Sequence, residues 1–257
     1  MLRKVYLYNE TPAIDLDVIY ICRYLSAQCP VLEIILRESF IARFYSPDLI
    51  KSLAGIWSDE LLSPGYKVLS EEERLEYEAI GYRQTEKLSP QVIYHGWPLW
   101  ELLKAQIPQK EASLNALHLI LTPRLAVTRE PDEKRFHART VLLGQPSIIS
   151  SSGLVEAPAR PQEYYFWQAG YRSLGLEIPE AVIREKFADQ FLTYHDSRLS
   201  EVALGYILQT IAYYFYGEAF CQDPSCRLFN AHYQKAMLAA QLTFPEFCPR
   251  HSTLFSS

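Results

Sequence analysis

Residues 4–37 read KVYLYNETPAIDLDVIYICRYLSAQCPVLEIILR, a stretch with two strand patterns around one helix pattern. Aliphatic side chains alternate with tyrosines in 4–9, which is the two-residue period of a strand. Apolar residues recur at helical spacing in 14–28, and 31–37 is an apolar run of the kind found in buried strands. A strand, a helix and a strand in this order form a β-α-β unit, which predicts a parallel pair of strands.

Later segments extend this unit into a mixed sheet covered by helices. Apolar strand patterns lie at 116–122, 135–143 and 147–151. The stretch 199–216 is apolar on almost every side, which indicates a long, buried central helix. The expected fold class is therefore α/β (α+β), a mixed sheet followed by a small C-terminal helical subdomain. Further helices are predicted at 47–57, from Ser70 (where Glu73 has capping-box spacing), and at 98–107, 161–173, 179–192 and 231–242.

The composition excludes several classes of function. The chain of 257 residues is 49% hydrophobic and 21% charged, which is enough to bury a substantial core. Its net charge of −5 and pI near 5.7 give no general attraction for phosphate backbones, so we expect no nucleic-acid partner. No segment reaches the roughly 20 uninterrupted apolar residues of a membrane span, and the first residues read as a strand rather than a signal peptide. We therefore expect a cytoplasmic protein with no membrane partner.

Cysteine spacing gives the strongest chemical signal. The cysteines number five, and an odd number does not favour a secreted disulfide framework. Cys22 and Cys29 are far from the others and are expected to be buried thiols. The remaining three cluster in CQDPSC at 221–226 and CPRH at 248–251. Two short ligand pairs joined by a loop are the usual framework of a tetrahedral zinc site.

Cys221, Cys226, Cys248 and His251 are therefore the predicted ligands of one zinc ion. Three thiolates and one imidazole fill all four coordination positions, and a closed site of this kind is structural rather than catalytic. His232 is an alternative fourth ligand. Because C-x-x-H is the more common geometry and His232 begins a predicted helix, His251 is favoured.

This constellation resembles the archaemetzincins, zinc peptidases with the pattern H-E-x-x-H-x-x-G-x-x-H-C-x4-C-x-M followed by C-x-x-C. The similarity of motif covers about residues 198–251. The resemblance implies a structural zinc on the four predicted ligands, with His251 in place of the last cysteine, and it places Gly217 at the sharp turn that ends the active-site helix. It also implies one metzincin-like domain, 1–257, with the sheet in 1–195 and the central helix and zinc-binding subdomain in 196–257.

The same alignment places the three catalytic histidines of that family on Thr210, Tyr214 and Phe220, and its general-base glutamate on Ile211. None of these side chains is a competent replacement, because a hydroxyl and a phenol are poor zinc ligands and isoleucine cannot accept a proton. The motif H-E-x-x-H is absent from the chain. We therefore expect a catalytically inactive, metallopeptidase-like zinc protein, a pseudoenzyme that binds an unknown peptide, protein or small molecule.

Two other interpretations stay open. One is a metallopeptidase or other metal-dependent hydrolase with a rearranged site, built from His137, His195 or His232, of which His137 and His195 are the catalytic candidates. The other is an interaction module, in which the zinc-binding segment presents a surface to a partner protein. The fold resemblance also predicts a cleft, whose candidate lining residues are Thr210, Tyr214, Arg139 and Glu156.

Overall fold

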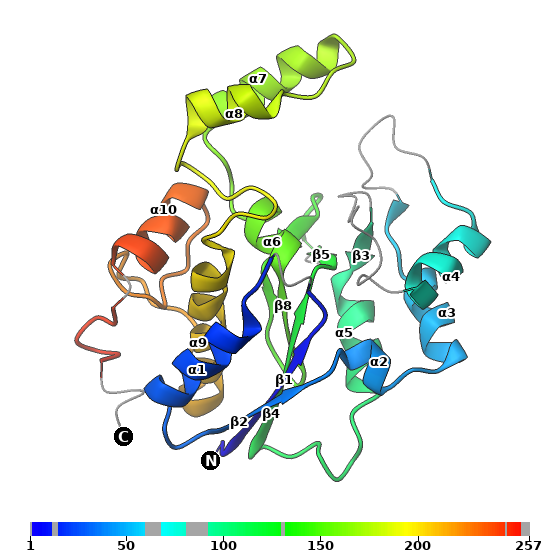
Figure 1. Ribbon diagram of the computed structural model, residues 1–257, viewed down its shortest axis with the longest axis vertical. Coiled ribbons are helices and arrows are strands. Elements are labelled where there is room, and N and C mark those ends of the chain that lie inside the picture. Colours follow the sequence, from blue (N-terminus) through cyan, green and yellow to red (C-terminus); the bar gives the residue numbers. More distant parts are fainter. Residues whose placement is uncertain are drawn as a thin grey trace.

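The computed structural model describes residues 2–11, 15–59, 68–80, 92–129, 132–244 and 246–252. Its centre is a five-stranded sheet with the order β2-β1-β4-β8-β7, in which the first four strands are parallel and β7 is antiparallel to β8. Helices lie on both sides of this sheet (Figure 1), so the predicted mixed α/β class is confirmed. The strands are β1 (Lys4–Asn9), β2 (Glu33–Arg37), β4 (Ala116–Thr122), β7 (Val141–Leu142) and β8 (Ser147–Ser150).

The predicted β-α-β unit is present at the N-terminus. β1 and β2 are parallel neighbours, and α1 (Val18–Gln28) connects them. The helix begins later than predicted because the Asp17 side chain accepts a hydrogen bond from the Tyr20 backbone N–H at 2.9 Å and caps the helix there. The prediction of a buried second strand is wrong, since β2 is an edge strand and Glu33 is exposed.

A second, three-stranded sheet was not predicted as a separate sheet. Its order is β3-β5-β6, with β3 (Ile93–His95) parallel and β6 (His137–Arg139) antiparallel to β5 (Leu125–Thr128). The single strand predicted at 135–143 is divided between the two sheets, as β6 and β7. Strands of two to four residues contain too few alternating positions for a pattern to be read from sequence.

The central strands separate two hydrophobic cores. On one face, Leu7 and Leu119 pack with α1 and with the central helix α9 (Leu199–Tyr216). On the other face, Tyr8 and Ile120 pack with α3 (Pro47–Gly55) and α5 (Gly96–Lys104). This division follows from the alternation of side chains along a strand. The helices of the second face are α2 (Phe40–Arg43), α3, α4 (Glu71–Ile80), whose predicted capping box between Ser70 and Glu73 is present, and α5.

The central helix α9 has the bounds that the sequence predicted. Every residue from Val202 to Ala212 is buried. Gly217 ends the helix with a φ of 75°, a left-handed conformation that glycine adopts without strain. The chain then forms a compact segment, residues 217–252, which we call the C-terminal lobe. It contains α10 (Gln234–Leu238) and the π-helical turn η2 (Ala239–Thr243), and Figure 1 shows α10 on the same side of the sheet as α1 and α9.

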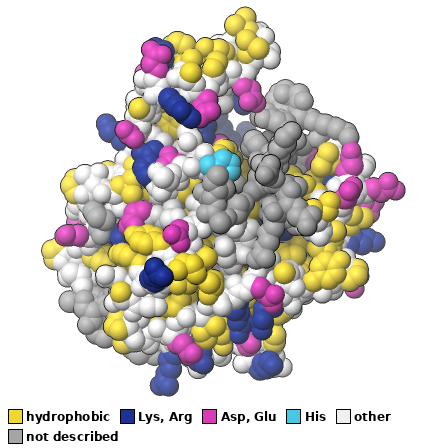
Figure 2. Space-filling model, viewed as in Figure 1, with side chains coloured by type: hydrophobic (Ala, Val, Ile, Leu, Met, Phe, Trp, Pro, Cys, Tyr) yellow, Lys and Arg dark blue, Asp and Glu magenta, His cyan; other side chains and the backbone are white. Residues whose placement is uncertain are grey.

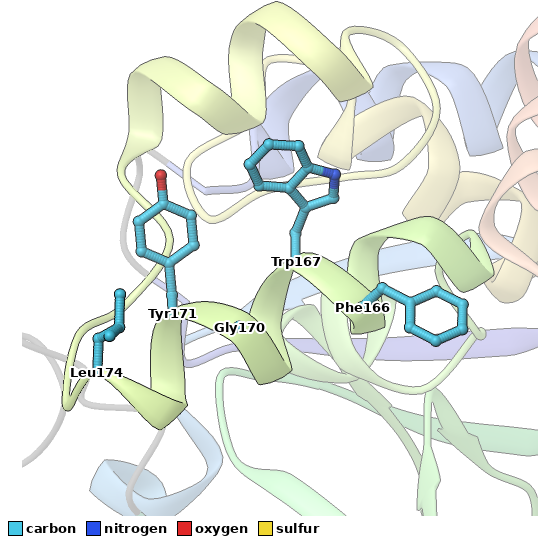
Figure 3. A pocket seen from close by; sticks show the side chains of 5 residues that line it. All are labelled: Phe166, Trp167, Gly170, Tyr171 and Leu174. Carbon is cyan, nitrogen blue, oxygen red and sulfur yellow. The ribbon is translucent and has the colours of Figure 1, made fainter.

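α7 (Gln162–Ser173) and α8 (Glu180–Phe187) form a hairpin that projects from the rest of the molecule (Figure 1). This α7–α8 hairpin has a small core of its own, made by Tyr164, Phe187 and Phe191. Hydrophobic side chains also lie on its outer surface, where Phe166 is 70% exposed (Figure 2). A hollow of about 390 Å³ lies on α7, and Figure 3 shows Trp167 and Tyr171 among the side chains that line it. A short helix that was not predicted, α6 (Ser151–Glu156), follows β8 directly.

The C-terminal lobe packs against the same core as the sheet. The larger of the two main cores extends from Leu2 to Cys248 and includes both β1 and the lobe. The single domain 1–257, with a boundary between its two parts at 195–196, stays a prediction. No helix in the described part of the chain has both the length and the apolar character that a bilayer span requires.

Candidate metal centre

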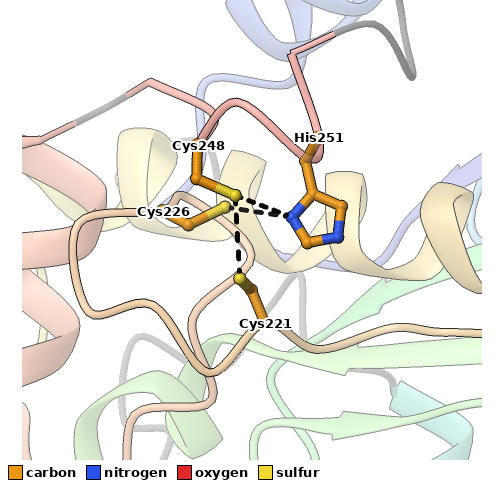
Figure 4. A group of neighbouring side chains, drawn as sticks. All are labelled: Cys221, Cys226, Cys248 and His251. Carbon is orange, nitrogen blue, oxygen red and sulfur yellow. Dashed lines mark hydrogen bonds between the residues drawn. The ribbon is translucent and has the colours of Figure 1, made fainter.

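The four predicted zinc ligands lie together in the C-terminal lobe, each with a relative exposure of 9% or less. Their candidate ligand atoms, three Sγ and one imidazole nitrogen, all lie within 4.8 Å of one another. Cys221 Sγ is 3.9 Å from Cys248 Sγ, and His251 Nδ1 is 3.5 Å from Cys226 Sγ and 3.2 Å from Cys248 Sγ (Figure 4).

Backbone hydrogen bonds hold the first ligand pair in a closed loop. The Cys221 N–H donates to the Leu228 carbonyl at 2.7 Å, and the Asn230 N–H donates to the Cys221 carbonyl at 3.2 Å. Inside the loop, the Cys226 N–H donates to the Asp223 carbonyl at 3.0 Å, and the Asp223 N–H donates to Cys221 Sγ at 3.4 Å. Hydrogen bonds of this last kind orient a metal-binding thiolate.

The second ligand pair is held in a single turn. The backbone N–H groups of His251 and Ser252 both donate to the Cys248 carbonyl, at 2.8 and 2.9 Å. This turn places the His251 imidazole beside the Cys248 thiol (Figure 4). In this turn, the C-x-x-H spacing directs the side chains of Cys248 and His251 toward each other.

The donor set and its spacing fit a tetrahedral zinc ion. With Zn–S bonds of about 2.3 Å and Zn–N bonds of about 2.0–2.1 Å, tetrahedral ligands are about 3.8 Å apart between two sulfurs and about 3.6 Å apart between sulfur and nitrogen. The S–S distance of 3.9 Å and the S–N distances of 3.2 and 3.5 Å are close to these values. Four protein ligands would complete the coordination sphere, with no position for water or substrate.

Burial shifts the pKa of two of these ligand groups. Desolvation raises the pKa of the Cys226 thiol to about 12, so this sulfur is neutral at neutral pH unless a cation lies beside it. Burial also lowers the pKa of His251, which favours the neutral imidazole that metals bind. A divalent cation at the centre would deprotonate the thiols, and its binding would therefore release protons.

A buried arginine joins this site to the rest of the molecule. Arg227 follows the second cysteine, and its side chain is only 2% exposed. It forms an ion pair with Glu201 of α9 and donates to the Tyr24 hydroxyl of α1 at 2.8 Å. Its carbonyl accepts from Gln241 Nε2 at 2.8 Å, and Gln241 lies so close to Gly205 that a Cβ there would be 1.7 Å from its Oε1. Sequence reasoning missed this residue, because a single arginine has no spacing that could reveal such a role.

The alternative ligand His232 lies outside the cluster. It is exposed, and its backbone carbonyl accepts a hydrogen bond from the Ala159 N–H at 2.8 Å. Its position is therefore set by a contact between the lobe and the segment that precedes α7. The structure places His251, and not His232, among the cysteines.

The positions that the archaemetzincin resemblance assigns to catalysis carry no metal-binding group. Thr210 is buried, and its hydroxyl donates to the Tyr206 carbonyl one turn earlier in α9, at 2.9 Å. Ile211 is fully buried in the main core. The Tyr214 hydroxyl donates to the Gly144 carbonyl at 3.0 Å, so it joins α9 to the β7–β8 turn. These three side chains support packing.

The predicted catalytic and cleft residues outside α9 are divided between two places. His137 and Arg139 belong to β6, where His137 is half exposed and lies 2.9 Å from Glu133. Arg139 Nε donates to Thr128 Oγ1 at 2.6 Å across the small sheet. Neither is among the residues that line the cavity near Glu156.

Glu156 and His195, in contrast, line one cavity together. Glu156 pairs with Arg160 at 3.0 Å, and His195 Nδ1 lies 2.7 Å from Asp15 Oδ1. His195 also has a φ of 61°, which is uncommon for a residue with a side chain. All six histidines and all five cysteines of the chain lie in the described residues, and there the Cys221, Cys226, Cys248 and His251 cluster is the one group with the spacing of a metal site.

Comparisons with known proteins give a family and one similar solved structure. No curated protein matches the chain. The crystal structure of the archaemetzincin from Methanopyrus kandleri is similar over 99% of this chain and 94% of its own, with 10% sequence identity and a TM-score of 0.44. The model of a probable metallopeptidase family, DUF6775, matches residues 1–257, which confirms the predicted metallopeptidase-like family. The chain therefore belongs to the probable metallopeptidase family DUF6775.

Proposed function

We propose that this chain is a zinc-binding member of its family that holds one structural zinc ion on Cys221, Cys226, Cys248 and His251 and does not hydrolyse peptides. The observation that carries the proposal is the convergence of four protein ligand atoms within 4.8 Å, with separations of 3.9, 3.5 and 3.2 Å for three of the pairs, close to those of a tetrahedral site. Such a site is filled by the protein itself.

A zinc ion at this centre would supply folding free energy rather than catalysis. The first ligand pair belongs to the loop that follows α9, and the second to the last turn of the described chain. The intervening residues include Arg227, α10 and η2. The two pairs converge only when this segment is folded, so the free energy of metal binding becomes free energy of folding.

The absence of peptidase activity is inferred from α9. Metal-assisted hydrolysis needs an open coordination position for water and a base within hydrogen-bond reach. A closed site offers no such position, and the resemblance assigns the general base to Ile211, which cannot accept a proton. The remaining role is binding, of a peptide, a protein or a small molecule.

Metal analysis and a peptidase assay on the same purified sample test this proposal together. We expect one zinc per chain by inductively coupled plasma mass spectrometry, and no hydrolysis of a fluorescein-labelled casein above background, with or without added zinc. Two zinc ions per chain would instead support an enzyme with a second, open site.

Variants of the two catalytic candidates separate a true activity from a contaminant. Chelator-sensitive hydrolysis that survives repurification, and that His137→Ala or His195→Ala abolishes, would overturn the proposal. Hydrolysis that both variants leave unchanged would come from a contaminating peptidase. The exposed His232→Ala serves as the matched control, since it changes a histidine outside both the metal cluster and the cavity.

A further inference from the structure

The cavity that contains Glu156 and His195 lies at the edge of the central sheet where ligands bind in many α/β proteins. β1 leads through α1 to β2 on one side, whereas β4 leads through β5 to β8 on the other. The chain therefore diverges in opposite directions from the carboxyl ends of β1 and β4, and ligand sites of open parallel sheets lie at such points. Residues from the connections that follow β1, β4 and β8 meet here, as Asp15, Leu125 and Glu156 show.

The cavity has the size of a small-molecule site. Its volume is about 630 Å³, within the range of roughly 300–1,000 Å³ that is typical of ligand pockets. α6 and the start of β5 form one wall, the α7–α8 hairpin forms the opposite one, and His195 lies at the connection to α9. The hairpin seen at the top of Figure 1 thus covers this edge of the molecule.

Three hydrogen-bond donors on the wall lack a partner among the described residues. Arg160 donates through Nη1 to the Tyr164 hydroxyl at 2.8 Å and through Nη2 to Glu156 at 3.0 Å, but its buried Nε has no acceptor. The buried Tyr194 hydroxyl lies near the Glu156 carboxylate and the Ser152 hydroxyl but forms a well-aligned hydrogen bond with neither. The third donor is the exposed guanidinium of Arg172, which forms no ion pair with a described carboxylate.

The state of the Tyr194 hydroxyl makes it a donor at neutral pH. Burial and the negative charge of Glu156 raise its pKa, so the phenol stays protonated. A buried polar group without a well-aligned partner has a cost in free energy. A ligand atom that accepted its proton would remove this cost.

The carboxylates in and beside the cavity already have partners. Glu156 pairs with Arg160, and the Glu180 carboxylate lies 2.5 Å from the Arg184 guanidinium. Asp15 accepts from the His195 imidazole, and Glu177 has a partner of its own. Each of these carboxylates has a partner, whereas, among the described residues, two arginines and a tyrosine carry donors without one, and these donors favour an oxyanion as the ligand.

The lining also contains an apolar part, which distinguishes between anions. Ile178, Ile183 and Phe191 line the cavity, and Phe191 is only 3% exposed. An inorganic phosphate would leave this surface without contact. We propose that the cavity binds a small organic carboxylate with an apolar body, with the carboxylate at Arg172 and Tyr194 and the apolar body against Ile183 and Phe191.

Calorimetric titration of the zinc-loaded full chain with 4-phenylbutyrate tests this proposal. We expect binding with a Kd below about 5 mM, whereas 4-phenylbutylamine and inorganic phosphate, which lack the carboxylate and the apolar body respectively, should not bind in this range. Arg172→Gln should weaken the affinity by about tenfold, because a charge-assisted hydrogen bond is lost, and Tyr194→Phe should weaken it by about threefold or more.

Arg23→Gln is the matched control, because Arg23 is an exposed arginine on α1, outside the cavity lining. It should leave the affinity unchanged. Because Arg172 is exposed, its replacement should not prevent folding, which circular dichroism checks. No heat of binding for the carboxylate, equal binding of the amine, binding of phosphate instead, or equal losses in Arg172→Gln and Arg23→Gln would each overturn the proposal.

Discussion

The C-terminal lobe and the α7–α8 hairpin are two peripheral regions that different interactions hold in place. The lobe shares the main core with the sheet, contains the metal-ligand cluster, and is attached to α9 by the buried ion pair between Arg227 and Glu201. The hairpin packs through a separate cluster of three buried aromatic rings, one of which, Tyr164, also accepts a hydrogen bond from Arg160. It also exposes large apolar side chains, such as Phe166 and Leu174.

This difference shows how each region can serve a different purpose. The Arg227 guanidinium fixes the lobe in one position on α1 and α9, and a metal on the cluster would hold the two ends of the lobe together. Contact among a few rings permits the hairpin to open without loss of the main core, which suits an element that covers a cavity. The lobe should therefore depend on metal for its stability, whereas the hairpin should not.

The largest effect is expected for Cys226→Ser. This change removes one of the four ligands, and the loss of the metal should cost about 5 kcal/mol or more of folding free energy at saturating zinc. Hydrogen exchange should rise throughout residues 217–252 and remain low in the hairpin. Cys22→Ser is the control, since Cys22 lies on α1 outside the cluster. Full metal occupancy in Cys226→Ser would contradict the assignment of Cys226 as a ligand.

A smaller loss is expected for Arg227→Met, which removes the buried guanidinium and leaves Glu201 and Tyr24 without it. Breaking a buried ion pair lowers the free energy of unfolding by about 3–5 kcal/mol. Because Glu201 is partly exposed, we expect a loss near the lower limit for the pair of Arg227 and Glu201. Urea unfolding at saturating zinc measures this loss of stability. In the matched variant Arg250→Met, an exposed pair with Glu218 is lost, and the change should stay below about 1 kcal/mol. Equal losses in both variants would contradict the anchoring role.

The smallest of the three losses is expected for Phe187→Ala in the hairpin. The ring is 2% exposed, but it packs in a cluster with only two other buried residues, so we expect about 2–3 kcal/mol rather than the upper end of the usual range. Hydrogen exchange should increase in α7 and α8, with no change in zinc content. Phe166→Ala, at a 70% exposed position, should have little effect. Loss of zinc from Phe187→Ala would show that the two regions are coupled.

Sequence patterns predicted the elements whose residues are numerous and uniformly buried. β1, β4 and α9 have the predicted bounds, because a long period or an unbroken apolar run leaves few alternatives. α6 and β5 were missed, since six and four residues are too few to show a period. The strand expected at 135–143 was divided between two sheets, a choice that depends on neighbours distant in sequence.

The two candidate sites differ in the same way. The metal-ligand cluster could be predicted because thiols and an imidazole are rare side chains and their spacing along the chain reflects their coordination. The cavity could not, because its wall combines ordinary residues from α6, the hairpin and the connection to α9. Glu156 and His195 were named as candidates, but nothing in the sequence indicated that they share a cavity with Tyr194 and Arg172.

The most direct test of the account is X-ray absorption at the zinc K-edge on the purified, full-length chain. We predict one zinc site with three sulfur ligands at about 2.3 Å and one nitrogen ligand at about 2.0 Å, as a closed site on Cys221, Cys226, Cys248 and His251 requires. A spectrum dominated by nitrogen and oxygen, or one that needs a bound water, would contradict it.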